Sequence, residues 1–209
     1  MEIVSYLKDI YGYGTPIFLK DIRIGRKSKS AIRKELSRAV NDGKITRRSQ
    51  GVYYFKKEGP LSRELSFEEI VKKKYIEEDY GFPGLELNIY GYYSGQTFLN
   101  MIGLSQQVPA VLEITTNNTS CKRLYCSDGY NAIIRKGKTK IDRTNYRALQ
   151  FFDMLSSSLS DEEIRTNKEF LKKYIHKHLI KKDFIENAKF YSTRVIKLII
   201  EEGLIDAFR

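Results

Sequence analysis

The chain has 209 residues, of which 41% are hydrophobic, and its formal net charge at pH 7 is +11. This length suits two small domains, and no apolar run approaches the ~20 residues that a membrane-spanning helix requires. The N-terminal segment carries Glu2 and Asp9 and lacks the layout of a signal peptide. We therefore expect a cytoplasmic protein that has no membrane partner.

The positive charge is concentrated in the first third of the chain. Residues 1–60 hold 14 Lys and Arg against 6 Asp and Glu, whereas residues 61–209 hold 23 against 20. A local excess of this kind suits a polyanion such as DNA, because each neutralised phosphate releases a counterion. Charge alone leaves a generic basic surface open as the alternative, so the residue pattern has to distinguish the two.

Two helices are predicted before residue 25. Apolar residues between Ile3 and Tyr11 recur at helical spacing, and Gly12 and Gly14 end this first helix. Thr15-Pro16 is typical of a helix start, with threonine as the cap and proline in the first turn. The second helix is short, and its apolar residues are Phe18, Leu19 and Ile22.

A third helix is predicted after a turn at residues 23–30. Its inner stripe is apolar and consists of Ile32, Leu36, Ala39 and Val40. Its outer face is basic and polar and consists of Lys29, Arg33, Lys34, Ser37, Arg38 and Asn41. Asn41-Asp42-Gly43 ends the helix, because glycine readily adopts the left-handed conformation of a C-cap. A helix with two such faces can pack on a core and enter the major groove of DNA.

Two short strands follow at residues 44–47 and 52–55, joined by a turn at 48–51 that ends in glycine. Three helices and a hairpin with a basic tip give the order of a winged helix-turn-helix, so we predict a domain over residues 1–58 that binds double-stranded DNA. The expected DNA contacts are Lys29, Ser30, Arg33, Lys34, Ser37 and Arg38 on the recognition helix and Arg47, Arg48 and Gln50 on the wing. A winged helix that contacts only protein is the alternative.

A second domain over residues 61–209 is expected after the boundary at Glu58-Gly59-Pro60. Ser66 and Glu69 match a capping box, and the helix that they begin is predicted to run to about Tyr80. The further elements expected are a strand at 85–90, a short helix at 94–101, strands at 109–116, 122–126 and 132–135, and helices at 145–155, 161–180 and 183–202. The last helix is apolar on more than one face, so we expect it to be buried, either inside this domain or against a partner.

The predicted fold class is therefore α+β. An N-terminal winged helix-turn-helix is followed by a mixed α/β domain, which ends in a helical C-terminal region.

Two blocks of this sequence resemble the AbiEi-type antitoxins and their close relatives. The first is GYYSGQTFLNMIGLSQQVP at residues 91–109, where the family has a similar short helix followed by a Gly-Leu-Thr-Thr-Gln-Val-Pro stretch. The second is the wing, GKITRRSQGVYY at residues 43–54. The chain departs from the family at Ser105-Gln106, where Thr-Thr is frequent.

The resemblance implies a bacterial antitoxin that represses its own operon and opposes a nucleotidyltransferase-like toxin, often in phage defence. The first domain would bind an operator with inverted repeats, and the remainder would carry the antitoxin role. Two other interpretations stay open. One is a stand-alone transcriptional regulator whose C-terminal domain senses a ligand or dimerises, and the other is a DNA-acting enzyme.

Cysteines and histidines give no pattern of a metal site. Cys121 and Cys126 are expected in one strand on opposite faces, as two ordinary thiols that are buried or half-buried, and no second cysteine pair exists. His176 and His178 point in different directions on their helix, and His178 is expected to pack in the core. We therefore predict no metal ligand.

No constellation of catalytic residues is evident either. The chain contains no phosphate loop of the full form Gly-x-x-x-x-Gly-Lys-Ser or Gly-x-x-x-x-Gly-Lys-Thr, so no nucleotide cofactor is expected. A nuclease centre would have to use Glu86, Glu113 and Asp128, and Thr115 stands where a lysine would be expected after Glu113. We accordingly predict a protein that is not an enzyme and has no cofactor.

Overall fold

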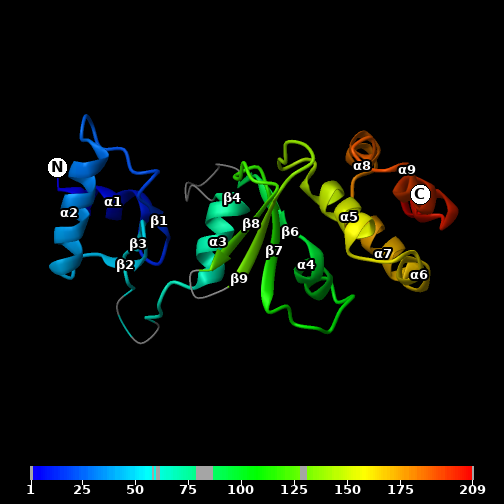
Figure 1. The fold of residues 1–209 in the computed structure, drawn as a ribbon, viewed down its shortest axis with the longest axis horizontal. Coiled ribbons are helices and arrows are strands. Elements are labelled where there is room, and N and C mark those ends of the chain that lie inside the picture. The colour runs from blue at the N-terminus through cyan, green and yellow to red at the C-terminus, as the bar shows by residue number, and fades with distance from the viewer. Residues whose placement is uncertain (1, 58, 60–61, 79–86, 128–130, 209) are drawn as a thin grey trace. The chain divides into compact units, whose positions relative to one another are not determined.

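The computed structural model describes residues 2–57, 59, 62–78, 87–127 and 131–208, without the side chains of residues 125–127 (Figure 1). The chain divides into two compact units, Met1–Lys73 and Lys74–Arg209. Helices and small sheets occur together, so the α+β class is confirmed. Within the described ranges, no helix combines the length and the apolar character needed to traverse a bilayer.

The first unit contains three helices and a small antiparallel sheet. Its elements are α1 Ile3–Tyr11, β1 Ile17–Phe18, α2 Lys29–Asn41, β2 Thr46–Ser49, β3 Val52–Tyr54 and the beginning of α3 Phe67–Tyr75. The sheet order is β1-β3-β2. α2 has the predicted amphipathic character, because Ile32, Leu36 and Ala39 are buried in the core of this unit. The predicted third helix and the hairpin are thus confirmed.

The predicted second helix is wrong. Ile17 and Phe18 form a strand that pairs with Tyr53 and Val52 of β3, and residues 19–21 make only a turn. Leu19 N donates to Gly51 O at 2.9 Å, which extends the pairing. Both side chains of β1 are buried, so pairing with a distant strand outweighs the local signal of a threonine cap followed by proline.

The first unit also continues past the boundary that the sequence indicated at Glu58–Pro60. Leu65 and Ile70 form a second small apolar cluster with Phe18, Val52 and Tyr54 of the sheet. The capping box of Ser66 and Glu69 is confirmed. Ser66 N donates to Glu69 Oε2 at 2.8 Å, and Glu69 N donates to Ser66 Oγ at 3.1 Å. The helix ends at Tyr75 rather than near Tyr80, which lies outside the described residues.

The second unit is built on a mixed sheet of four strands in the order β6-β7-β9-β8. The strands are β6 Gly91–Tyr93, β7 Val111–Thr116, β8 Arg123–Ser127 and β9 Asn131–Lys136. β7 and β9 run parallel, and the two outer strands are antiparallel to their neighbours. A small separate ladder joins β4 Glu77–Glu78 to β5 Asn88–Ile89. The strands predicted at 109–116, 122–126 and 132–135 are confirmed within one to two residues at their ends.

Glycine at position 91 is required by close packing of the backbone. A Cβ atom there would lie 2.0 Å from the carbonyl oxygen of Tyr75 and 2.8 Å from that of Thr115. No side chain fits at these distances, so Gly91 allows β6 to lie against β7. The sequence did not indicate this strand, which is only three residues long.

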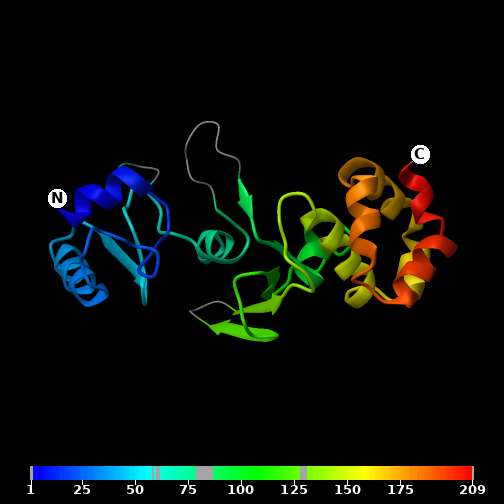
Figure 2. The ribbon, with the colours of Figure 1, turned by 90° about the horizontal axis from the view of Figure 1, so that it is seen from above.

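Helices make up the remainder of the second unit (Figure 2). They are α4 Gly95–Met101, α5 Tyr146–Ser157, α6 Asp161–Thr166, α7 Lys168–His178, α8 Lys181–Ala188, α9 Thr193–Glu201 and the short 3-10 helix Leu204–Phe208. α5 is central to the core, since Phe151, Phe152 and Leu155 have no exposed surface. Phe152 stacks on both Phe184 and Tyr191, with ring centroids 4.5 and 4.7 Å apart.

The two long C-terminal helices that the sequence predicted are each broken in two. Asn167 separates α6 from α7, and its side chain donates to Glu163 O at 2.8 Å. α8 and α9 are separated by residues 189–192, because Tyr191 turns inward and donates to Leu149 O and to Asp153 Oδ1. Within this chain the predicted last helix is only partly buried, since Phe184, Val195 and Leu198 are in the core but Ile185 and Ile200 are 55% and 63% exposed.

Candidate functional site

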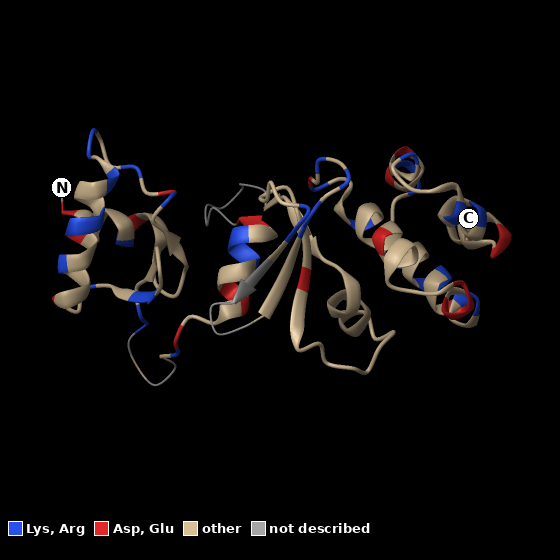
Figure 3. Ribbon diagram, in the orientation of Figure 1, with Lys and Arg blue, Asp and Glu red and all other residues tan. Residues whose placement is uncertain are grey.

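The outer face of α2 carries the predicted recognition residues together. Lys29, Ser30, Arg33, Lys34, Ser37 and Arg38 are all exposed. Figure 3 shows the basic residues spread along this helix. Among the residues that the structure describes, none of the four basic side chains in this set has an acidic partner. The face therefore offers charge that is not already neutralised within the protein.

The beginning of α2 is fixed by serine hydroxyls. Ser28 Oγ accepts a hydrogen bond from Ala31 N at 3.2 Å, and it lies 2.9 Å from Ser30 Oγ. Ser30 thus already has a partner within the protein, which the sequence did not reveal. Lys27, by contrast, forms an ion pair with Glu35 at 2.7 Å, so its charge is already neutralised within the protein.

One further exposed basic residue comes just before α2 in the chain. Arg26 is exposed in the turn before α2 and has no ion-pair partner in the described part of the chain. Its place within the basic turn at residues 23–30 was the signal that could have identified it.

The three predicted wing residues differ from one another in the structure. Arg47 is exposed and donates to Ser49 O at 3.3 Å, and Gln50 is exposed at the turn. Arg48 is only partly exposed, and its Nε donates to Leu65 O at 3.0 Å. The register shifts between Arg47 and Ser49, so a bulge turns Arg48 toward the segment before α3. Arg48 therefore differs from Arg47 and Gln50, because it is bonded to the backbone and less exposed to solvent.

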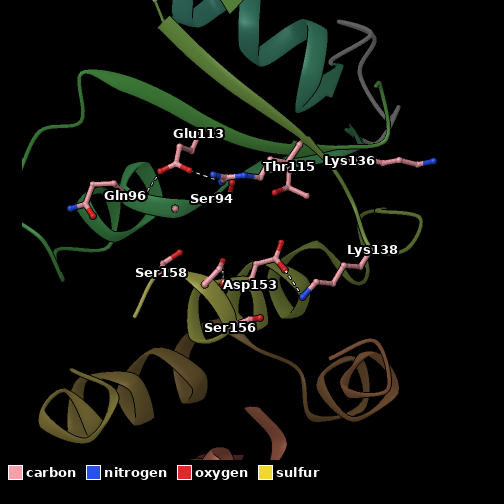
Figure 4. A pocket seen from close by; sticks show the side chains of 12 residues that line it. Ser94, Gln96, Glu113, Thr115, Lys136, Lys138, Asp153, Ser156 and Ser158 are labelled. Atoms are coloured by element: carbon pink, nitrogen blue, oxygen red, sulfur yellow. Dashed lines mark hydrogen bonds and ion pairs between the residues drawn. The ribbon is translucent and has the colours of Figure 1, made fainter. Parts of the chain in front are cut away.

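A polar cavity of about 510 Å³ lies in the second unit (Figure 4). It is lined by residues from the start of α4, from the parallel strands β7 and β9 and from α5. The lining residues are Ser94, Gly95, Gln96, Glu113, Thr115, Arg135, Lys136, Lys138, Asp153, Ser156, Ser157 and Ser158. The block that resembles the antitoxin family contributes Ser94, Gly95 and Gln96 to this wall.

Glu113 and Arg135 form an ion pair on the sheet side of the cavity. Arg135 Nη1 donates to Glu113 Oε2, and Gln96 N donates to Glu113 Oε1 at 3.1 Å. A Cβ atom on Gly95 would lie 2.2 Å from Glu113 Oε1, so only glycine at that position leaves room for the carboxylate. Both oxygens of Glu113 are thus occupied by donors from the protein.

Asp153 holds a second network on the α5 side. Its carboxylate accepts from Tyr92 Oη at 2.7 Å and from Tyr191 Oη at 2.9 Å, and Lys138 Nζ lies 3.5 Å away. Lys138 also lies over the ring of Tyr191, 3.8 Å from its centroid. Burial, followed by the nearby charge of Asp153, raises the pKa of Tyr92 and that of Tyr191 well above the ordinary value. Both hydroxyls therefore keep their protons at neutral pH and donate to Asp153.

The residues considered for a nuclease centre do not form one in the described structure. Glu113 is held by Arg135, whereas Glu86 and Asp128 lie outside the described residues. Across the described residues, no group of three or more His, Cys, Asp and Glu could hold a metal ion.

The cysteine and histidine expectations are met only in part. Cys121 is a free, exposed thiol that precedes β8, so the prediction that it is at least half-buried within the strand is wrong. The side chain of Cys126 lies outside the described part of the structure. His178 packs on Tyr174 at 4.7 Å between ring centroids, and burial lowers its pKa, while His176 is exposed.

Comparisons with models of known protein families, with curated proteins and with solved structures find no match to this chain. The resemblance to AbiEi-type antitoxins therefore rests on the two sequence blocks alone.

Proposed function

We propose that the chain binds double-stranded DNA through the outer face of α2, as a winged-helix transcriptional regulator. The observation that carries this proposal is the set of exposed basic residues on α2 that have no acidic partner in the described structure: Lys29, Arg33, Lys34 and Arg38. The opposite face of the same helix is fixed in the core by Ile32, Leu36 and Ala39. A rigid helix with an unneutralised basic face is suited to the major groove.

The arrangement around α2 supports the same proposal. The order α1, β1, α2, β2 and β3, with a sheet in which β3 lies between β1 and β2, supports the proposal of a winged helix whose second helix is reduced to a turn. The turn at residues 19–21 stands in the place of that helix. In this proposal Arg47 and Gln50 on the hairpin contact phosphate, whereas Arg48 remains bonded to Leu65 O.

The test is a mobility-shift titration on operator DNA selected from a random library. The double variant Arg33→Ala, Arg38→Ala should weaken specific binding by roughly 2–4 kcal/mol if both arginines contact bases, since a bidentate base contact contributes ~1–3 kcal/mol. The matched control replaces Lys173 and Lys177, two exposed lysines of α7, and removes the same charge. If both double variants lost the same operator affinity, net charge alone would explain the effect, and the recognition-helix assignment would be contradicted.

We further propose that this regulator is an autorepressor and an antitoxin of AbiEi type. The support is the block at residues 91–109, which forms β6, α4 and the loop that leads to β7. The test uses the full chain, co-expressed with a nucleotidyltransferase-like toxin from the neighbouring gene. The Arg33→Ala, Arg38→Ala variant should lose repression of the operon but still restore growth. If neither the wild type nor the variant restored growth, or if no such neighbouring gene existed, the stand-alone regulator would be favoured.

A further inference from the structure

Each carboxylate of the polar cavity already has donors and a cationic partner from the protein. Glu113 accepts from Arg135 and from Gln96 N, and Asp153 accepts from two tyrosine hydroxyls and faces Lys138. The charge of each carboxylate is thus balanced by a basic side chain of the chain itself. The cavity therefore does not present itself to a ligand as an acidic site, although two carboxylates line it.

The donors that line the cavity are, by contrast, largely unused. Arg135 employs only Nη1, which leaves Nε and Nη2 without a partner among the described residues. Lys136 follows Arg135 in β9, and its side chain points away from the other lining side chains in Figure 4, so it is not counted among these donors. Hydroxyl groups of Thr115, Ser156 and Ser158 add further donors with no hydrogen bond to another described side chain.

Ser94 is the most informative of these groups. The residue is only 5% exposed, and its hydroxyl oxygen is buried without any hydrogen-bond partner in the described structure. Buried polar groups are nearly always paired, because leaving one unpaired costs ~1–3 kcal/mol. An orphaned hydroxyl in the wall of a polar cavity therefore indicates a partner that is not part of the chain.

The two walls of the cavity differ in character. The strand wall provides the guanidinium of Arg135 from β9, whereas the facing wall is the C-terminal part of α5 with its serines (Figure 4). A helix C-terminus carries roughly half a negative charge and disfavours an anion next to it. A ligand that suits both walls has an anionic group at one end and hydroxyl groups at the other.

From this geometry we propose that the cavity binds a phosphate-bearing small molecule of nucleotide size. Its phosphate lies against Arg135 and Ser94, and its sugar hydroxyls face the serines of α5. A guanidinium with two free nitrogens matches the oxygens of a phosphate, which is the geometry that makes arginine a preferred phosphate ligand. A volume of about 510 Å³ accommodates a nucleotide, because pockets for such ligands span roughly 300–1,000 Å³. The inference does not depend on DNA binding by α2.

The test is calorimetric titration of the full chain with ATP, AMP, adenosine and inorganic phosphate. We expect ATP or AMP to bind, and we expect adenosine to bind at least about tenfold more weakly than AMP because it lacks the phosphate. Ser94→Ala should weaken nucleotide binding by about tenfold, the loss of one hydrogen bond to a charged group. Arg135→Lys keeps a positive charge opposite Glu113 but loses the planar fork, so it should weaken binding at least as much.

Two controls make the outcome decisive. Lys140→Ala removes an exposed lysine of the same segment that does not line the cavity, and it should bind like the wild type. Arg33→Ala, Arg38→Ala should also bind nucleotide like the wild type, whereas loss of binding there would place the ligand on α2 and overturn the proposal. Absence of binding by both ATP and AMP, equal binding of adenosine and AMP, or unchanged binding in both Ser94→Ala and Arg135→Lys would each overturn it as well.

Discussion

The outer face of α2 and the polar cavity of the second unit use the same residue types in opposite ways. On α2 the basic side chains are exposed and have no acidic partners in the described structure, so they meet water and counterions. In the cavity Arg135 and Lys138 each face a carboxylate that is less than one-fifth exposed. Exposed charge on a rigid helix suits a long polyanion, whereas paired and partly buried charge suits a ligand of one defined shape.

This difference has a consequence for stability. Exposed residues on α2 can be exchanged with little effect on folding, because they contact solvent in both the folded and the unfolded state. The charged residues of the cavity are connected to the core of the second unit, since the partners of Asp153 come from β6 and from the turn before α9. Substitutions in the two regions should therefore separate binding from folding.

The largest effect on folding is expected for Asp153→Ala. The substitution leaves the hydroxyl of Tyr92 without its acceptor and Lys138 without its carboxylate, so we expect a loss of about 3 kcal/mol in the free energy of unfolding. Urea denaturation followed by circular dichroism measures it. The Arg33→Ala, Arg38→Ala variant is the comparison and should change stability by no more than about 0.5 kcal/mol per site. If both variants lost a similar free energy of unfolding, the proposed difference between the cavity and the outer face of α2 would be contradicted.

The second prediction concerns alkaline pH. The pKa values of Tyr92 and Tyr191 are raised in the folded chain, so the folded state keeps these protons after the unfolded state has lost them above pH ~10. The contribution of these two tyrosines to stability is therefore constant below that pH and falls above it, by about 1.4 kcal/mol per pH unit for each tyrosine.

Tyr191→Phe tests this assignment. The variant should show a shallower alkaline fall than the wild type in urea denaturation at a series of pH values, because one titrating group is gone. An unchanged slope would mean that other groups, and not this network, limit stability at high pH.

Much of the first unit could be predicted from sequence because its signals are local. The stripe of Ile32, Leu36 and Ala39 specifies the buried side of α2, and the glycine at 51 specifies the hairpin turn. β1 could not be predicted, because its partner is β3, more than thirty residues further along the chain. Nothing in the local pattern of Thr15 to Phe18 encodes that pairing.

The cavity could not be predicted from the sequence either, because it too depends on pairing between strands that are distant in the chain. Glu113 and Arg135 share one face of the sheet because β7 and β9 pair in parallel with Thr115 opposite Arg135, and side chains two residues apart in a strand point the same way. A parallel register between strands separated by a third strand cannot be read from spacing. The sequence did single out Glu113, but it provided no sign that Arg135 would neutralise it.

A smaller effect is expected at the wing. Sequence alone makes Arg47 and Arg48 equivalent, whereas in the structure Arg48 is bonded to Leu65 O. Arg47→Ala should reduce the slope of log affinity against log salt concentration by about 0.9, the value for one phosphate contact, and Arg48→Ala should leave it nearly unchanged. Filter binding at several salt concentrations measures both slopes. Equal reductions would show that Arg48 leaves Leu65 and reaches the phosphate.

The smallest expected effect is on the stability of Ser94→Ala, and it distinguishes two serines that look alike in sequence. Ser94 and Ser30 both stand at the beginning of a helix, but Ser30 has the hydroxyl of Ser28 as a partner and Ser94 has none among the described residues. Removing a buried hydroxyl that has no partner eliminates a desolvation cost, so Ser94→Ala should leave the melting temperature unchanged or raise it slightly. Thermal unfolding of the ligand-free chain measures this, with Ser30→Ala as the comparison. A clear loss of stability in Ser94→Ala would show that the hydroxyl has a structural partner, and the argument for a ligand at this position would lose its main support.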